Sequence, residues 1–293
     1  MKIKIIVDSS SGLTEKEANE LGWDFIPLQC EIEGKNYQIG KEIFIEDFAK
    51  MWRDNKKINA STSASSPGTN SLIVEKYLED YDKVLIYPIS QFLSSEMSFL
   101  KTQFQDNQNV HIVESKKISY LIVRDLLIFE DLIKKGHKFE EAIEVFEQNN
   151  EKLILIPQYN DALVKGGRLS KPAAAIAKLL KIVPLIAFNK GILEKEGIGR
   201  VFSKSLEKVV SDMWQNNKND LENKKLIVLS AENEIIDDLI YKFKNITENK
   251  ISIYKFRAPL DVSIHTGIGA ICVSIAVVKP EIEEKFFSLA KKV

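Results

Sequence analysis

The chain has 293 residues, of which 44% are apolar, so it can bury the cores of two domains of ordinary size. Its 41 basic and 42 acidic residues leave a formal net charge of -1, which excludes the basic surplus typical of proteins that bind nucleic acid. The only cysteines, Cys30 and Cys272, lie far apart in apolar stretches, so we expect neither a disulfide framework nor a cysteine metal site. Reduced thiols favour a cytoplasmic location.

The sequence contains no segment typical of export or of a membrane span. Residues 5–7 form the only apolar run near the first residue, and this run is far shorter than the core of a signal peptide. The longest nearly apolar segment, residues 268–278, is about half as long as a transmembrane helix. We therefore expect no transmembrane segment.

In the first half of the chain, short apolar runs alternate with amphipathic segments. We expect strands at residues 2–7, 25–32, 37–39, 84–88, 110–113 and 153–157, the second and third forming a hairpin. We expect helices at residues 14–21, 44–55, 96–105, 118–135 and 139–149, and a further helix that begins at Pro67. The pair Thr14 and Glu17 predicts a capping box. Strands that alternate with helices predict a parallel sheet covered on both faces.

The pattern changes after residue 157, where we place a domain boundary, with an N-terminal domain at residues 1–157 and a C-terminal domain at residues 158–293. Gly166 and Gly167 interrupt a helical segment, which is followed by an alanine-rich helix ending at Leu180. Further strands are expected at residues 183–188, 192–193, 226–230 and 251–256, and helices at residues 203–216, 234–243 and 280–293. This second domain is also predicted to be α/β.

Hydroxyl side chains gather in residues 61–69, immediately before the helix that begins at Pro67. Ser66 and Pro67 are typical of an N-cap and first helical residue. Hydroxyls and free N–H groups at a helix N-terminus suit a phosphate or a carboxylate, although an ordinary serine-rich surface loop explains the same composition. Residues 89–95, which include Ser94, repeat the order of strand, hydroxyl-rich turn and helix.

Two further residues are candidates for a binding site. His265 lies in a predicted turn rich in glycine and hydroxyl groups, where Gly267 and Gly269 would let the backbone approach a ligand; the alternative is a structural histidine. Arg168 follows a glycine pair and could bind an anion or an acidic partner, or could simply be solvated at a helix end. No dinucleotide, P-loop or zinc motif is present, so we expect no metal and no cofactor.

A serine hydrolase could be assembled from Ser94, His265 and Asp261, but two features disfavour it. Ser94 does not lie in a G-x-S-x-G elbow, and Asp261 is only four residues from His265, which is unusually local for the acid of a triad. The candidate residues supply hydroxyls, one imidazole and one guanidinium, but no carboxylate base. Such a set suits anion binding better than it suits catalysis.

Five segments, in this order, resemble motifs of the DegV family, also called FakB fatty-acid-binding proteins. The segments are Val7-Asp8-Ser9, Thr62 to Gly68 (similar to T-S-Q-P-S-P-G), Ser90 to Glu96 (similar to S-S-x-L-S-G-T), Val164 to Arg168 (similar to K-G-G-R) and His265 to Gly269 (similar to H-x-G-P-G). The resemblance implies an α/β protein of two domains, each a mostly parallel sheet with flanking helices, with a ligand tunnel between them. It also implies a bound long-chain fatty acid and a separate ATP-dependent fatty acid kinase that converts the bound carboxylate to an acyl phosphate.

Transferred residue by residue, the resemblance assigns the fatty-acid site to Thr62, Ser63, Ser94, Ser95 and His265. His265 would support phosphoryl transfer, and Arg168 would face the kinase, while catalysis would belong to the partner. The chain itself would then be a carrier and not an enzyme.

The sequence departs from the family pattern at Ala64, Ser65, Ser95, Glu96 and Ile268. We expect Ser95 to narrow the carboxylate site, and Glu96 to add a like charge near the bound anion unless it points to solvent. These departures keep two alternatives open: a hydrolase of esters or thioesters, and a binding protein for a non-lipid acidic ligand.

Overall fold

The computed structural model describes residues 1–148, 151–178 and 182–293, and these residues form two compact units. The first unit comprises Met1–Ile122 together with Pro259–Ile264, and the second comprises Val123–Ala258 together with His265–Val293. Both contain a sheet with helices, so the predicted α/β class is confirmed. Asn149 and Leu180, the expected ends of two helices, lie outside the described residues.

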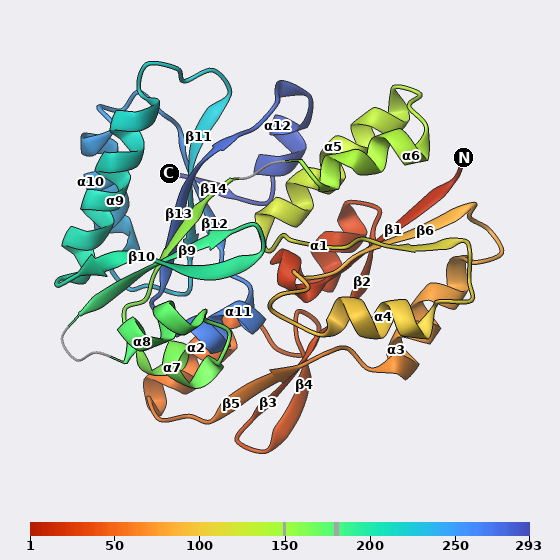
Figure 1. The fold of residues 1–293 in the computed structure, drawn as a ribbon, viewed down its shortest axis with the longest axis horizontal. Coiled ribbons are helices and arrows are strands. Elements are labelled where there is room, and N and C mark those ends of the chain that lie inside the picture. Colours follow the sequence, from red (N-terminus) through yellow and green to blue (C-terminus); the bar gives the residue numbers. More distant parts are fainter. Residues whose placement is uncertain (149–150, 179–181) are drawn as a thin grey trace. The chain divides into compact units, whose positions relative to one another are not determined.

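The first unit contains a parallel sheet whose strands were largely predicted from the apolar runs. In the order β2-β1-β6-β7, it consists of Asp24–Ile26, Ile3–Asp8, Lys83–Tyr87 and Val110–Ile112. All three pairings are parallel, and Figure 1 shows β1 beside β6. Val7 of β1 lies opposite Tyr87 of β6. The carboxyl ends of these strands therefore meet at one edge of the sheet.

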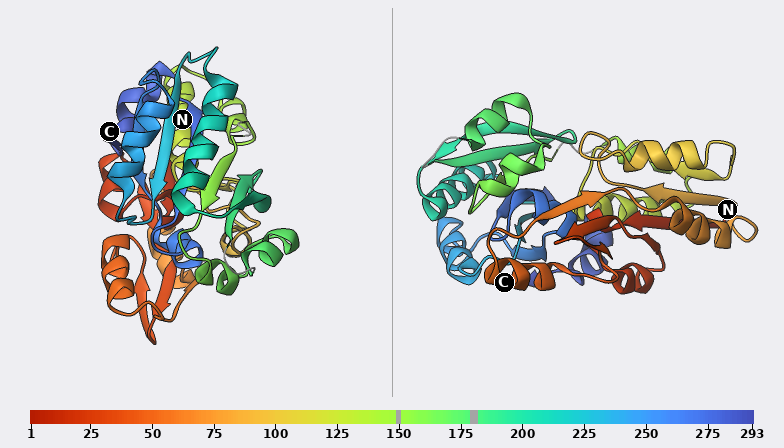
Figure 2. Two further views of the ribbon diagram at one scale, coloured as in Figure 1. Left: turned by 90° about the vertical axis from the view of Figure 1, so that its left-hand side faces the viewer. Right: turned by 90° about the horizontal axis from the view of Figure 1, so that it is seen from below.

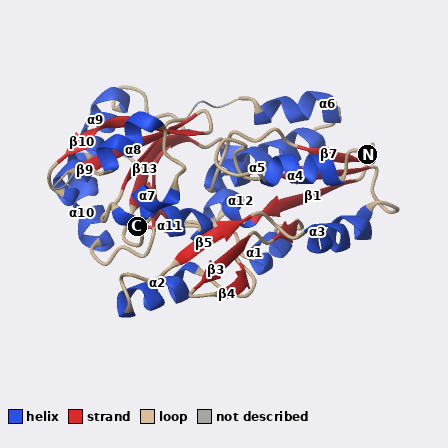
Figure 3. Ribbon diagram, turned by 60° about the horizontal axis from the view of Figure 1, so that its bottom comes forward, coloured by secondary structure: helices blue, strands red, loops and turns tan. Residues whose placement is uncertain are grey.

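A second, antiparallel sheet in the same unit carries the hydroxyl-rich segment. It has the order β4-β3-β5, with strands Lys35–Gln38, Gln29–Ile32 and Ala60–Ser63 (Figure 3). The predicted hairpin is present, but its first arm is shorter than expected, because β2 ends at Ile26 and pairs with β1 instead. Pro27 follows β2 and has no N–H to donate to a sheet, which favours a break at this position.

The helices of the first unit begin within one residue of the predicted positions. They are α1 (Glu15–Glu20), α2 (Ile45–Asp54), α3 (Pro67–Val74) and α4 (Glu96–Gln103). The capping box of α1 is confirmed, since Thr14 Oγ1 accepts from the N–H of Glu17 and Glu17 Oε2 accepts from that of Thr14. The Gln103 amide donates to the carbonyl of Pro67 at 2.8 Å and so joins α4 to α3.

The sheet of the second unit is mixed, which corrects the expectation of a mostly parallel sheet. In the order β10-β9-β8-β13-β11-β12-β14, it consists of Ile192–Gly199, Val183–Asn189, Leu153–Ile156, Ile271–Val277, Lys224–Ser230, Ile253–Arg257 and Lys291–Lys292. Within the described part of this sheet, β11 and β12 form the parallel pair, and the other pairings are antiparallel. An apolar strand does not reveal the direction of its neighbours, so composition could not predict this order.

Strand β8 was expected to close the N-terminal domain, ahead of a boundary at residues 157 and 158. It pairs instead with β9 and β13 of the second sheet. The tail was expected to be one helix, but α12 ends at Phe287 and β14 then pairs with β12. Both differences arise from pairing between segments distant in sequence.

The remaining helices are α5 (Tyr120–Lys134), α6 (Phe139–Ala142), α7 (Asp161–Gly166), α8 (Lys171–Ala177), α9 (Phe202–Asn217), α10 (Ile236–Ile246), α11 (Leu260–Thr266) and α12 (Pro280–Phe287). Helices α9 and α10 lie side by side against the sheet of the second unit, where Trp214 and Phe243 join its buried core (Figure 2). Within the described ranges, every helix is too short or too polar to cross a lipid bilayer.

Candidate functional site

The carboxyl ends of β1 and β6 form the natural binding edge of the first unit. The chain leaves β1 toward β2 on one side and leaves β6 toward β7 on the other, so the strand order reverses direction between β1 and β6. In open α/β sheets, ligands bind outside the strand ends at such a switch point. Polar loops that begin at Asp8 and at Ser90 follow these two strands.

Asp8 connects the two strand ends by hydrogen bonds. Its Oδ1 accepts from the N–H and the hydroxyl of Ser10, at 3.0 and 2.5 Å, and its Oδ2 accepts from the N–H of Ile89 at 2.6 Å. Burial, followed by the nearby Glu96 carboxylate, raises the pKa of Asp8 well above its ordinary value. The sequence marked Asp8 as part of a motif, but its role as a link between the loops became visible only in the structure.

The segment expected to be a hydroxyl-rich loop begins as strand β5. Thr62 lies opposite Cys30 of β3, whereas Ser63 lies opposite Gln29. Successive side chains of a strand point to opposite faces, so those of Thr62 and Ser63 lie on opposite sides of the sheet. Thr62 is half-buried and Ser63 is exposed, which makes Thr62 the better ligand-binding candidate of the two.

Helix α3 starts at the predicted position, but its cap differs in detail. Ser66 is the N-cap residue and Pro67 the first helical residue, yet the Ser66 hydroxyl makes no capping hydrogen bond. The neighbouring Ser65 is buried and forms the hydrogen bonds that hold this segment in place.

Ser94 and Ser95 occupy the turn before α4, in different environments. Ser94 is half-buried, and its Oγ accepts from the N–H of Glu96 at 3.2 Å. Ser95 is exposed, and its backbone has φ -80°, a conformation open to every residue type. Its side chain lies at the exposed start of the helix, and its effect on the width of the carboxylate site stays a prediction.

Glu96 is buried and bound by the hydroxyl-rich segment, not by solvent. Its Oε2 accepts from the N–H of Ser65 at 2.8 Å and its Oε1 from the Ser65 hydroxyl at 2.5 Å. Burial raises the pKa of Glu96, and the two bonds from Ser65 oppose that rise. These bonds connect the segment that contains Thr62 to the turn that contains Ser94.

In the second unit, His265 lies beside the glycine pair. It occupies the last turn of α11, not the irregular turn that the sequence predicted. A Cβ atom at Gly166 would lie 3.1 Å from Nδ1 of His265, so the imidazole packs directly on the Gly166 backbone. Gly167 ends α7 in the left-handed conformation, with φ 67°.

Arg168 is exposed and closes the glycine turn by donating from Nη1 to the carbonyl of Gly166 at 2.6 Å. Burial of the imidazole, followed by the charge of Arg168, lowers the pKa of His265 to about 4. His265 is therefore neutral at pH 7, when it can donate one hydrogen bond and accept another.

Gly269 approaches the protein's own side chains closely. With φ 86°, a Cβ there would lie 1.9 Å from Oε1 of Gln158, and the Gly269 carbonyl accepts from Nδ2 of Asn233 at 2.5 Å. The expectation that this glycine makes room for a ligand is thus replaced by an internal packing role.

Asp261 of the first unit is buried, and neither of its carboxyl oxygens has a hydrogen-bond partner among the described residues. Burial raises its pKa to about 7, although the nearby N–H groups of Asp261 and Val262 lower it. An orienting acid of a catalytic triad would accept a hydrogen bond from the histidine. Neither oxygen of Asp261 accepts a hydrogen bond of this kind among the described residues.

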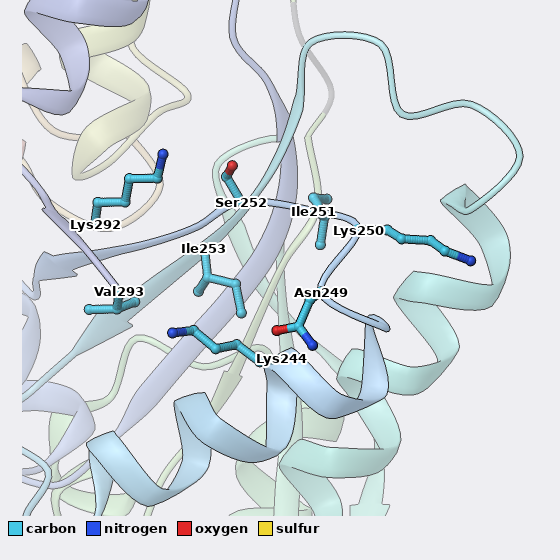
Figure 4. A pocket seen from close by; sticks show the side chains of 8 residues that line it. All are labelled: Lys244, Asn249, Lys250, Ile251, Ser252, Ile253, Lys292 and Val293. Atoms are coloured by element: carbon cyan, nitrogen blue, oxygen red, sulfur yellow. The ribbon is translucent and has the colours of Figure 1, made fainter.

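A pocket in the second unit is lined by Lys244, Asn249, Lys250, Ile251, Ser252, Ile253, Lys292 and Val293. The side chains of its three lysines point in different directions, so they do not converge on one anion (Figure 4). Among the residues that the structure describes, no group of three metal-ligating side chains is close enough to bind a metal ion.

Comparisons with known proteins agree with the resemblance in the motifs. Residues 2–278 match a family model described as "Uncharacterised protein, DegV family". A DegV domain-containing protein of Mycoplasmopsis pulmonis is 40% identical over 284 residues, which cover 96% of this chain and 97% of the relative.

Two solved structures share the fold. The structure of DegV, a fatty acid binding protein from Bacillus subtilis, has a TM-score of 0.81 at 20% identity and covers 94% of this chain and 99% of its own. A stearic-acid-binding protein from Eubacterium ventriosum has a TM-score of 0.78 at 20% identity. The match covers 93% of this chain and 97% of the other. The predicted fold family is confirmed.

Proposed function

The chain belongs to the DegV family, and on this premise we propose that it binds a long-chain fatty acid, with the carboxylate held by the hydroxyls of Thr62 and Ser94. Two proteins that share its fold are described as binding fatty acids.

The observation that carries the proposal is the connection between the two hydroxyl-bearing segments. Ser65 lies three residues after Thr62 and binds Glu96, whose N–H binds Ser94. Half-buried hydroxyls can hydrogen-bond a carboxylate without neutralising it as a buried arginine would. An oxygen of the bound carboxylate therefore keeps the electron density needed to attack a phosphoryl group.

We also propose that a separate ATP-dependent fatty acid kinase phosphorylates this carboxylate in the cytoplasm, and that this chain supplies no catalysis of its own. Arg168 is exposed and its guanidinium has donors beyond the one bound to Gly166, which suits contact with an acidic partner surface. His265, being neutral at pH 7, would support the transfer by hydrogen bonding and not by charge.

The two alternatives receive less support. A hydrolase needs an orienting acid, and the carboxyl oxygens of Asp261 have no hydrogen-bond partner among the described residues. Ser95 and Glu96 suggested a non-lipid acidic ligand. Ser95 is exposed, however, and both carboxylate oxygens of Glu96 accept hydrogen bonds from Ser65.

The experiment is a comparison of fatty acid affinity between Thr62→Ala and Ser61→Ala proteins by titration calorimetry with stearate. Both changes lie on β5, but the Ser61 side chain is on the exposed face and serves as the control. We expect Thr62→Ala to weaken binding by about 1 to 3 kcal/mol, the cost of an unsatisfied buried acceptor, and Ser61→Ala to have no effect. Equal affinities for the two variants would place the carboxylate elsewhere.

A further inference from the structure

We propose that Glu96 is a positioning residue whose side chain, by binding Ser65, fixes the spacing between Thr62 and Ser94. This inference rests on the proposed function, because it assigns a role to Glu96 in that same carboxylate site. Its role is inferred from the contacts that Glu96 makes in the first unit.

One residue contacts both halves of the site. The carboxylate of Glu96 accepts two hydrogen bonds from Ser65, at 2.5 and 2.8 Å, while its backbone N–H donates to Ser94 Oγ at 3.2 Å. Ser65 and Glu96 are separated by 31 positions in the sequence, so these bonds join two segments that no local structure would hold together.

The backbone N–H of residue 96 occupies one acceptor position of the Ser94 oxygen. A serine hydroxyl has one proton to donate, and its oxygen here accepts from Glu96. Among the described residues, no acceptor for the Ser94 proton is found. The proton is therefore available to donate to a ligand carboxylate.

Burial makes the link between the segments strong and specific. Glu96 is fully buried and Ser65 is 7% exposed, so neither group could exchange its partner for water without opening the segment. Both carboxylate oxygens of Glu96 are occupied by Ser65, which argues for a positioning role and against direct contact with the ligand.

The test measures stearate affinity and amide hydrogen exchange in Glu96→Ala, Glu96→Gln, Ser65→Ala and the double variant Glu96→Ala/Ser65→Ala. Glu79→Ala, a change of an exposed glutamate of the same unit, is the matched control. Exchange is followed in ligand-free protein for peptides that cover residues 60–70, so it reports the order of the segment independently of the ligand.

We expect E96A to weaken stearate binding at least about tenfold and to speed exchange across residues 60–70, because the buried donors of Ser65 lose their acceptor. E96Q retains an acceptor oxygen and should bind within about threefold of wild type. S65A keeps its N–H bond to Glu96, so it should lose less stearate affinity than E96A. The double variant should lose no more stearate affinity than E96A, because both changes break the same link. If E96A does not fold, S65A and E96Q still test that link.

Other outcomes would overturn specific statements. If wild-type protein binds stearate and both E96A and S65A bind it equally well, Glu96 does not position the site, whatever the change in stability. Failure of E96Q to restore affinity would also contradict the positioning role. Wild-type protein that takes up no stearate would instead contradict the proposed function itself.

Discussion

The imidazole of His265 packs on the backbone of Gly166, at a distance where a methyl group would fit only if the histidine shifted. An added Cβ would lie 3.1 Å from Nδ1 and 3.2 Å from Cβ of His265. Since Arg168 donates to the carbonyl of the same glycine, one backbone position of the second unit connects this histidine and this arginine.

Gly166→Ala should therefore displace His265 and lower the free energy of unfolding by about 1 to 3 kcal/mol, the usual cost of overpacking. Denaturant unfolding measures the loss, and the shift of the His265 ring signals in an NMR spectrum shows its cause. Gly68→Ala is the control, because a Cβ there would meet no atom closer than 3.9 Å. Ring signals unchanged in the Gly166→Ala protein would mean that the contact can relax without moving the histidine.

The pKa of His265 gives a second prediction. An NMR titration of the ring protons should show His265 neutral down to about pH 5 and protonating near 4, with its signals assigned by their loss in His265→Gln. Arg168→Met should raise this pKa, but it should remain below 6.5, because burial is the larger cause. An ordinary midpoint in the wild-type protein would show that the imidazole is solvated.

The same pKa affects stability with a definite sign. The unfolded chain binds a proton at His265 near pH 6.5, whereas the folded protein does so only near pH 4. The stability that His265 contributes by staying neutral is thus present above pH 6.5 and is lost as the pH falls toward 4. His265→Gln should reduce the pH dependence of the unfolding free energy in this range.

Asp261 predicts the opposite dependence. Its pKa rises from 3.8 to about 7 on folding, so its contribution is present below pH 3.8 and is lost as the pH rises through 7. Asp261→Asn removes the cost of ionising a buried acid and should be more stable than wild type at pH 8, by up to about 4 kcal/mol, with little difference near pH 4. Asp80→Asn, at an exposed position, is the control. A stability difference that is the same at both pH values would mean that Asp261 does not titrate as a buried acid.

The sequence was sufficient to predict most elements of the first unit, because their signals are local. An apolar run predicted β1, and the capping box of Thr14 and Glu17 predicted the start of α1. Sheet membership was harder to predict. The four apolar residues of β8 fit either sheet, and only pairing with β9 and β13, which follow it in the chain, decides between them.

The candidate site was predictable by residue type but not by arrangement. The hydroxyls of Thr62 and Ser94 were visible in the sequence, whereas the strand alternation that separates Thr62 from Ser63 required the pairing of β5 with β3. The role of Glu96 depends on a partner 31 positions away, which no local pattern reveals. The tunnel for the acyl chain and the contact with a kinase stay predictions from the family resemblance.

The role of His265 in the proposed phosphoryl transfer can be separated from ligand binding. With a fatty acid kinase, ATP and stearate, His265→Ala should slow acyl phosphate formation more than it weakens stearate binding. The comparison requires both quantities in the same preparation, with Lys165→Ala, a change of an exposed neighbour, as the control. Equal losses of rate and affinity would make His265 a binding residue only.

The most direct test of fatty acid binding is native mass spectrometry of the protein purified from its expression host, followed by denaturation and lipid analysis of the released ligand. We expect one long-chain fatty acid per chain, together with reduced occupancy in the Thr62→Ala protein and unchanged occupancy in Ser61→Ala. A protein that is empty, and that takes up no stearate or other added fatty acid, would contradict the proposal that this chain is a fatty acid carrier.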